Sequence, residues 1–218
     1  MGYVDLLRAL PKSKRNVAAR AAGKTEEVKR ISREFGQAYF DGPREYGYGG
    51  YRYDGRWVPV ARDIVAHFGL KPGDRVLDVG CAKGFLVKDL MAVCPGLEAF
   101  GIDVSRYALD HCEPEVIGRL HLGNAEDLPF PDGSFAAVLA INSLHNLSRE
   151  RCLTALREIE RLAPGKGFVQ VDSYDTPAGK ALFEEWVLTA EFHDYPDGWI
   201  RLFAEAGYTG DYAWTVVE

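Results

Sequence analysis

The sequence lacks the features that would place it in a membrane or outside the cell. It contains no run of about 18 apolar residues, and its N-terminus lacks the continuous apolar stretch of a secretory signal. Its four cysteines include no Cys-x-x-Cys pair, which argues against a disulfide framework and a zinc knuckle. We therefore expect a soluble, cytoplasmic protein with buried thiols, no membrane association and no metal site.

An excess of positive charge is also missing, because the formal net charge is -6. A general nucleic-acid binder needs Lys and Arg to neutralise phosphates, so this charge argues against nucleic acid as a partner. Basic residues dominate only from Met1 to about Glu34. We expect this arm to be solvated and partly mobile. Contact of the arm with a phosphorylated substrate, an acidic carrier protein or nucleic acid is the alternative.

Beyond the arm, short apolar runs alternate with segments of helical periodicity, as a parallel sheet with crossover helices requires. A basic arm and Tyr/Gly-rich lid (residues 1–57) precede one domain (58–218). We expect a doubly wound α/β fold with helices on both faces of a mostly parallel, seven-stranded sheet that ends in an antiparallel strand. The expected strands are Arg75–Val79, Glu98–Ile102, Val116–His121, Phe135–Ile141, Gly167–Val171, Thr189–His193 and Tyr212–Val217. The expected helices are Val58–Phe68, Phe85–Val93, Arg106–Cys112, Arg149–Leu162, Ala178–Leu188 and Asp197–Ala206.

A glycine turn, Gly80-Cys-Ala-Lys-Gly84, follows the first strand and opens a helix. Such a turn lets backbone N–H groups and the helix N-terminus face a ligand at close range. The turn lacks the G-x-G-x-x-G spacing of dinucleotide enzymes, which disfavours a nicotinamide-dependent oxidoreductase. Asp103 closes the second strand, where a carboxylate can accept hydrogen bonds from both hydroxyls of a ribose. The run from Gly123 to Phe135, GNAEDLPFPDGSF, then leads into the fourth strand.

These three segments resemble the class I S-adenosylmethionine-dependent methyltransferases, in particular the methyltransferase-11-like branch with a pattern like G-D-A-x-x-L-P-F-x-D-x-S-F. The resemblance covers about residues 58–171. It implies that the glycine turn lies against the methionine part of S-adenosyl-L-methionine and that Asp78 helps to hold its amino group. Asp103 would bind the ribose, and Asn124 with the backbone of Ala125 the adenine. The expected cofactor residues are Asp78, Gly80, Ala82, Gly84, Asp103, Val104, Asn124, Ala125 and Asn142.

Two of these residues depart from the family pattern. Ala82 replaces a second glycine, which still permits close approach but narrows the allowed dihedral angles. Asn124 replaces an aspartate, and its amide oxygen can still accept a hydrogen bond from the adenine amino group. Neither departure excludes cofactor binding.

Catalytic candidates lie at the ends of the fourth and fifth strands, because methyl transfer requires a placed nucleophile and, for a protonated acceptor, a base. His145 is the expected base because its ordinary pKa lies near neutral pH. A hydrogen-bonded loop histidine is the alternative. Asn142 can orient the acceptor or the cofactor, and Asp172 can act as base or anchor. A metal site of His145, His193 and Asp172 has no local spacing to support it.

The aromatic segment Tyr39–Trp57 is expected to fold over the cofactor as a lid, since aromatic rings supply rigid contact area and arginines bind anions. A Gly/Tyr loop that merely packs on the domain is the alternative. The expected substrate-contacting residues are Tyr46, Tyr48, Tyr51, Arg52, Tyr53, Trp57, Tyr174 and Trp186.

The resemblance implies methyl transfer, with S-adenosyl-L-homocysteine as the product. The aromatic rings and arginines of the lid suit a small polar metabolite that contains a sugar, carboxylate or phosphate group. No D/N-P-P-Y/F sequence follows the fourth strand, which argues against a macromolecular substrate. The alternative function is a cofactor-binding scaffold subunit that acts through a partner. The acceptor atom is left open, since fold does not imply function. The sequence also leaves open whether the chain forms a homodimer.

Overall fold

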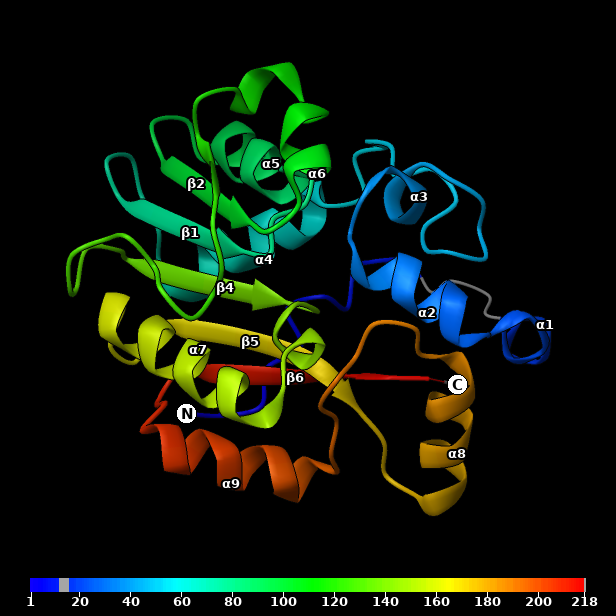
Figure 1. The fold of residues 1–218 in the computed structure, drawn as a ribbon. Coiled ribbons are helices and arrows are strands. Elements are labelled where there is room, and N and C mark those ends of the chain that lie inside the picture. The colour runs from blue at the N-terminus through cyan, green and yellow to red at the C-terminus, as the bar shows by residue number, and fades with distance from the viewer. Residues whose placement is uncertain (12–15, 218) are drawn as a thin grey trace.

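The computed structural model describes residues 1–11 and 16–217. Within these residues, one sheet of six strands has the order β3-β2-β1-β4-β5-β6, and every neighbouring pair is parallel. Figure 1 shows the sheet with helices on both of its faces. The strands are β1 (Arg75–Val79), β2 (Glu98–Asp103), β3 (Leu120–Leu122), β4 (Ala137–Ile141), β5 (Gly167–Ser173) and β6 (Asp211–Val216).

A hydrophobic core lies on each face of the sheet. On one face, α4 (Val58–Phe68) and α5 (Phe85–Val93) pack on the sheet together with Leu6 and Leu7. On the other face lie α7 (Arg149–Leu162) and α9 (Pro196–Ala206). The remaining helices are α1 (Val17–Gly23), α2 (Glu26–Arg33), α3 (Gln37–Phe40), α6 (Arg106–Asp110) and α8 (Pro177–Trp186), with 3-10 turns η1 (Pro114–Val116) and η2 (Leu144–Asn146). The expected doubly wound α/β fold is confirmed.

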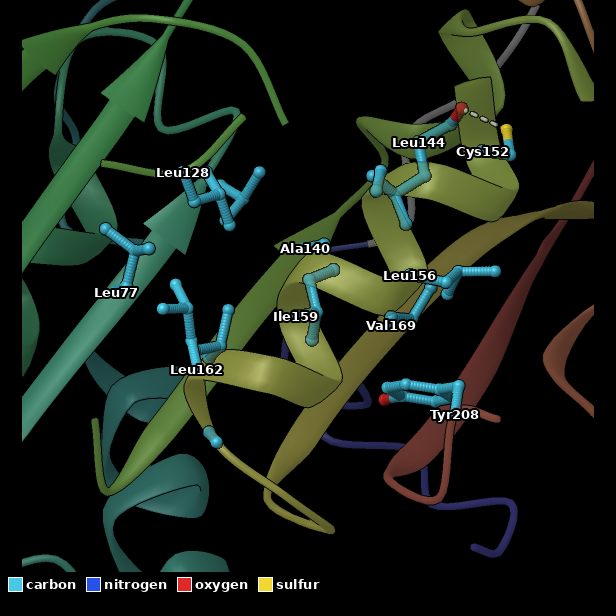
Figure 2. Close-up of a cluster of buried hydrophobic side chains, with 14 of the residues drawn as sticks. Leu77, Leu128, Ala140, Leu144, Cys152, Leu156, Ile159, Leu162, Val169 and Tyr208 are labelled. Atoms are coloured by element: carbon cyan, nitrogen blue, oxygen red, sulfur yellow. Dashed lines mark hydrogen bonds between the residues drawn. The ribbon is translucent and has the colours of Figure 1, made fainter. Parts of the chain in front are cut away.

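Helix α7 illustrates how local sequence determines an element. The Ser148 side chain caps its N-terminus by accepting a hydrogen bond from the N–H of Arg151 at 3.4 Å. Leu156, Ile159 and Leu162 recur at helical spacing and are fully buried. Figure 2 shows these side chains directed at the strands that carry Ala140 and Val169. The predicted bounds of α7 coincide with the observed ones.

Three expectations about the strands are wrong. Strand β6 runs parallel to β5, because α9 crosses one face of the sheet and returns the chain in the same direction. Residues 189–193 do not form a strand, since the N–H groups of Glu191 and Phe192 donate to the carbonyl of His145 at 2.9 and 3.2 Å. The described sheet therefore has six strands rather than seven, and β3 is shorter than predicted because η1 occupies residues 114–116.

The first residues of the chain pack on the domain rather than extending into solvent. The N–H of Val4 donates to the carbonyl of Tyr212 at 2.9 Å, and the N–H of Tyr212 donates to the carbonyl of Gly2 at 3.0 Å. Leu6 and Leu7 are buried in the core beside α4. The expectation of a solvated arm is therefore wrong for residues 2–7. Three of its basic residues, Lys12, Lys14 and Arg15, lie outside the described residues. None of the described helices has the length and apolar character needed to cross a bilayer.

Candidate active site

A cavity of about 410 Å³ lies where the strand order reverses, at the carboxyl ends of β1 and β4. Ligands of open α/β sheets bind at this switch point, because the loops after the two strands diverge there. Its volume falls within the range of small-molecule sites, roughly 300–1,000 Å³. Seven of the nine expected cofactor residues line it: Gly80, Ala82, Asp103, Val104, Asn124, Ala125 and Asn142.

Asp103, at the end of β2, presents a buried carboxylate to this first cavity. Its two oxygens accept hydrogen bonds from the N–H groups of Ala82 at 2.7 Å and Ser105 at 2.8 Å. Burial raises the pKa of Asp103, and these backbone donors oppose that rise. Because an ionised carboxylate has about four acceptor positions, the group retains capacity for ligand hydroxyls.

The backbone around the first cavity adopts unusual conformations. Three described non-glycine residues have positive φ, namely Phe35 (48°), Ala82 (50°) and Asn142 (53°), and all three line the cavity. The left-handed region costs an L-residue roughly 1–2 kcal/mol, and such residues cluster at functional sites. Gly80 also has positive φ (86°), and a Cβ atom there would meet the Cβ of Ser143 at 2.4 Å. The loops after β1 and β4 therefore approach too closely for any residue other than glycine at position 80.

Asp78 and Gly84 do not line the first cavity. Asp78 alternates with Leu77 and Val79 along β1, and those two side chains pack in the core beneath α7 and α9. Its carboxyl therefore points towards the other face of the sheet. Burial, together with the charge of Asp103, raises the pKa of Asp78 to about 7. Gly84 has φ of 75° and lies at the N-cap of α5.

A second cavity of about 250 Å³ adjoins the first. Four residues line both cavities: Tyr39, Tyr48, Asn142 and Asn146. The second cavity also brings together all three predicted catalytic residues, because Asn142 and His145 follow β4 while Asp172 lies in β5. The two cavities thus meet at the edge of the sheet where these residues converge.

His145 and Asp172 form a close pair in the second cavity. The Nε2 atom of His145 lies 3.4 Å from a carboxylate oxygen of Asp172, and its Nδ1 atom accepts the N–H of Asp172 at 3.1 Å. Since Nδ1 accepts, a neutral imidazole carries its proton on Nε2, the ring nitrogen next to the carboxylate. The indole N–H of Trp199 holds the same stretch by donating to the carbonyl of Asp172 at 3.1 Å. Asp172 therefore contacts both ring nitrogens of His145, one through its backbone N–H and the other through its carboxylate.

Asn142 is held in its strained conformation by residues of β5 and β6. The amide nitrogen of Gln170 donates to the hydroxyl of Thr215 at 2.8 Å, and that hydroxyl donates to the Oδ1 atom of Asn142 at 2.7 Å. Nearby, the Oδ1 atom of Asn146 is buried and has no hydrogen-bond partner among the described residues. A buried acceptor without a donor costs roughly 1–3 kcal/mol. A donor group on a bound ligand would satisfy it.

Residues of the N-terminal segment line both cavities. Figure 1 shows α1, α2 and α3 beyond the carboxyl ends of the strands. Asp41 fastens this segment to the domain, since its carboxylate accepts from the ammonium of Lys83 at 2.6 Å and from the hydroxyl of Tyr107 at 2.8 Å. Tyr39 and Tyr48 then contribute to the walls of both cavities.

Most of the expected substrate residues lie elsewhere. Of the eight, Tyr48 and Trp186 line the second cavity, and Arg52 lines a separate surface hollow of about 630 Å³. Tyr46, Tyr51, Tyr53, Trp57 and Tyr174 line none of the principal cavities. Two of them have partners inside the protein: the Tyr53 hydroxyl donates to Asp89 at 2.6 Å, and the Tyr174 hydroxyl bonds His193 at 2.9 Å. The described residues contain no group of three side chains suited to hold a metal ion.

Sequence reasoning missed several residues of the second cavity, above all Arg20 and Thr215. The sequence places Arg20 in a solvated arm and Thr215 in the final strand of the sheet. Their positions depend on how distant segments pack, and no local pattern reports that. The density of aromatic residues from Tyr39 onward was the one available signal.

Comparison with known proteins gives a consistent result. Residues 76–167 match the family described as "Methyltransferase domain". The chain is 34% identical over 128 residues to a demethylmenaquinone methyltransferase of Symbiobacterium thermophilum, covering 55% of this chain and 50% of that protein. It is 35% identical over 112 residues to a fatty-acid O-methyltransferase of Mycolicibacterium smegmatis, covering 48% and 40%. The chain thus spans about half the length, or less, of these relatives.

A solved structure supports the fold. Geranyl diphosphate C-methyltransferase from Streptomyces coelicolor A3(2), determined with Mg²⁺, geranyl diphosphate and S-adenosyl-L-homocysteine, superimposes with a TM-score of 0.58. The match covers 84% of this chain and 79% of that one at 17% identity. At this identity the likeness concerns the arrangement of strands and helices alone.

Proposed function

Residues 76–167 form a methyltransferase domain of the class I, S-adenosylmethionine-dependent kind, and on this premise we propose that the chain methylates a small polar molecule. The observation that carries the proposal is the pair of adjoining cavities that meet at Asn142. The first cavity contains Asp103, whose carboxylate suits the hydroxyls of a ribose, and the second contains the pair of His145 and Asp172. A methyl donor in the first cavity can therefore face an acceptor in the second.

The first cavity fits S-adenosylmethionine in size and in chemistry. Asp103 offers acceptor positions for ribose hydroxyls, and the glycine turn brings backbone close to the methionine part. Asn124 and Ala125 supply the polar edge for the adenine. When bound, this cofactor supplies a methyl group that is electrophilic because it is attached to a positively charged sulfur.

The residues of the second cavity orient the acceptor and remove its proton. Asp172 is the proposed base, because its carboxylate lines the cavity and can accept a proton from an O–H, N–H or activated C–H group. His145 is a positioning residue, since its Nδ1 accepts the backbone N–H of Asp172 and its Nε2 lies 3.4 Å from the Asp172 carboxylate. Asn142 lies between the cavities, where the acceptor atom must meet the methyl carbon.

Calorimetry with S-adenosylmethionine tests the donor side. We expect micromolar-range binding by the purified chain and at least tenfold weaker binding by Asp103→Ala, on the order of one lost charge-assisted contact. The matched control is Asp175→Ala, an exposed aspartate that lines neither cavity. No binding by the unaltered chain, or equal weakening in both variants, would contradict the proposal.

A screen with isotopically labelled cofactor and pooled metabolites, read as a mass shift, tests methyl transfer itself. Turnover by the isolated chain supports an enzyme that acts alone, and turnover only with an added protein supports the scaffold alternative. Removal of residues 1–24 does not separate these functions, because it deletes Leu6 and Leu7 from the core and Arg20 from the second cavity.

A further inference from the structure

The second cavity has two chemically different ends. At one end, Asn142 and Asn146 also line the first cavity. Asp172 lies near this end, because it is in register with Thr215, whose hydroxyl donates to Asn142. At the other end, Arg20, Arg44 and Trp186 also line a third cavity of about 320 Å³. The first and third cavities share no lining residue. The two arginines therefore lie at the end of the second cavity that is remote from the methyl donor.

Both guanidinium groups lie against the same indole ring. The Cζ atoms of Arg20 and Arg44 are 4.8 and 5.8 Å from the ring centroid of Trp186. Each group also donates to a backbone carbonyl, Arg20 to Glu45 at 3.0 Å and Arg44 to Gly47. These contacts fix the two forks in space. With five N–H bonds on each guanidinium, most donors remain available to a ligand.

The charge of this pair is not balanced within the described part of the chain. No carboxylate of residues 1–11 or 16–217 lies within ion-pair distance of Arg20 or Arg44. By contrast, Arg30 and Arg56, on the same N-terminal segment, each pair with an adjacent carboxylate. Burial lowers the pKa of Arg20, and the nearby charge of Arg44 lowers it further. Two cations held side by side at a cavity wall favour the entry of an anion.

We propose that the methyl acceptor carries a carboxylate or phosphate group, which Arg20 and Arg44 bind at Trp186 while the methylated atom lies near Asp172 and Asn142. This inference rests on the proposed function for the identity of the second cavity as the acceptor site. The acceptor is then a molecule with two separated polar ends. Asp172 repels the anionic end from the donor side of the cavity, so the same charges fix the direction in which the acceptor enters.

The test is calorimetric titration of the full chain with sodium phosphate, pyrophosphate and succinate, with and without S-adenosyl-L-homocysteine. We expect one-to-one binding of at least one anion, weakened at least tenfold in the double variant Arg20→Met/Arg44→Met. Methionine retains the aliphatic packing on Trp186 while removing the charge. Arg62→Met, an exposed arginine of α4 that lines none of the three cavities, is the matched control. The phosphate and succinate titrations distinguish the two kinds of anion.

The variant Arg20→Lys/Arg44→Lys keeps the charge and should retain more affinity than the methionine variant, which separates loss of charge from loss of fold. Unaltered anion binding in the methionine variant, or no binding of any of the three anions by the native chain, would overturn the inference. Cofactor affinity, measured on the same samples, should change less than twofold. If the native chain does not bind the cofactor, that result would count against the proposed function. The anion titrations without cofactor would still decide whether the anion site exists.

Discussion

The two adjoining cavities are assembled in different ways. Most of the first is lined by residues 79–147, in the loops that follow β1, β2, β3 and β4, and the rest by residues 33–48, Arg151 and Glu191. The second draws on residues from Arg20 to Thr215, which span almost the whole chain. The proposed donor site, built mainly from successive loops, depends on local sequence, whereas the proposed acceptor site, built from distant segments, depends on how those segments pack. The following substitutions separate the two sides.

Gly80→Ala should have the largest effect, because it disturbs the contact between the loops that follow β1 and β4. Gly80 and Gly73 have nearly equal φ, 86° and 87°, but a Cβ atom at Gly73 meets nothing within 4 Å. Gly73→Ala should therefore cost only the left-handed strain, roughly 1–2 kcal/mol. Gly80→Ala should cost about 2 kcal/mol more through the clash with Ser143, measured as the free energy of unfolding in urea.

A double variant sharpens the Gly80 prediction. Ser143→Gly removes the side chain that the new methyl group would meet, so adding it to Gly80→Ala should restore stability relative to Gly80→Ala alone. Equal losses for Gly80→Ala and Gly73→Ala would show that the close approach of the two loops carries no energetic weight.

Asp172→Asn should affect the acceptor side alone. Loss of the proposed base should lower kcat about 100-fold, while the affinity for S-adenosylmethionine stays within twofold because Asp172 does not line the first cavity. His145→Gln, which keeps an N–H donor near the carboxylate, should retain more activity than His145→Ala. A cofactor affinity that falls as steeply as kcat would contradict the separation of the two sides.

The same contrast explains which predictions succeeded. The predicted bounds of α4, β1, α5 and α7 coincide with those observed, because apolar periodicity and end signals such as Ser148 are local. Periodicity carries no information on strand direction, so the prediction that β6 is antiparallel was wrong. Residues 189–193 have an apolar pattern that suits a strand, but their N–H groups bond the carbonyl of His145 instead. Arg20 was missed because only the packing of α1 beside α8 brings it to the cavity.

Asp78→Asn tests the buried carboxyl behind the proposed donor site. The folded-state pKa of Asp78, about 7, lies above the ordinary value of 3.8. Between these pH values the folded protein holds a proton that the unfolded chain has released, so this group lowers the free energy of unfolding as the pH rises. The free energy of unfolding of Asp78→Asn, relative to that of the native chain, should rise by on the order of 3 kcal/mol from pH 4 to pH 8.

The measurement for Asp78 is urea unfolding of both proteins across that pH range. Asp110→Asn, which alters an exposed carboxylate of α6, is the control and should show no such trend. A constant difference between Asp78→Asn and the native chain would mean that Asp78 is ionised throughout.

Ala82→Gly should have the smallest effect and addresses the one position where the glycine turn departs from its family pattern. Ala82 has φ of 50°, so glycine relieves strain in the folded state. Glycine also increases the conformational freedom of the unfolded chain, which offsets part of the gain. We expect a net stabilisation of about 0.5 kcal/mol in urea unfolding. Ala108→Gly, at a buried helical position, should instead destabilise by about 1 kcal/mol. If Ala82→Gly destabilises as much as Ala108→Gly, the turn accepts alanine without strain.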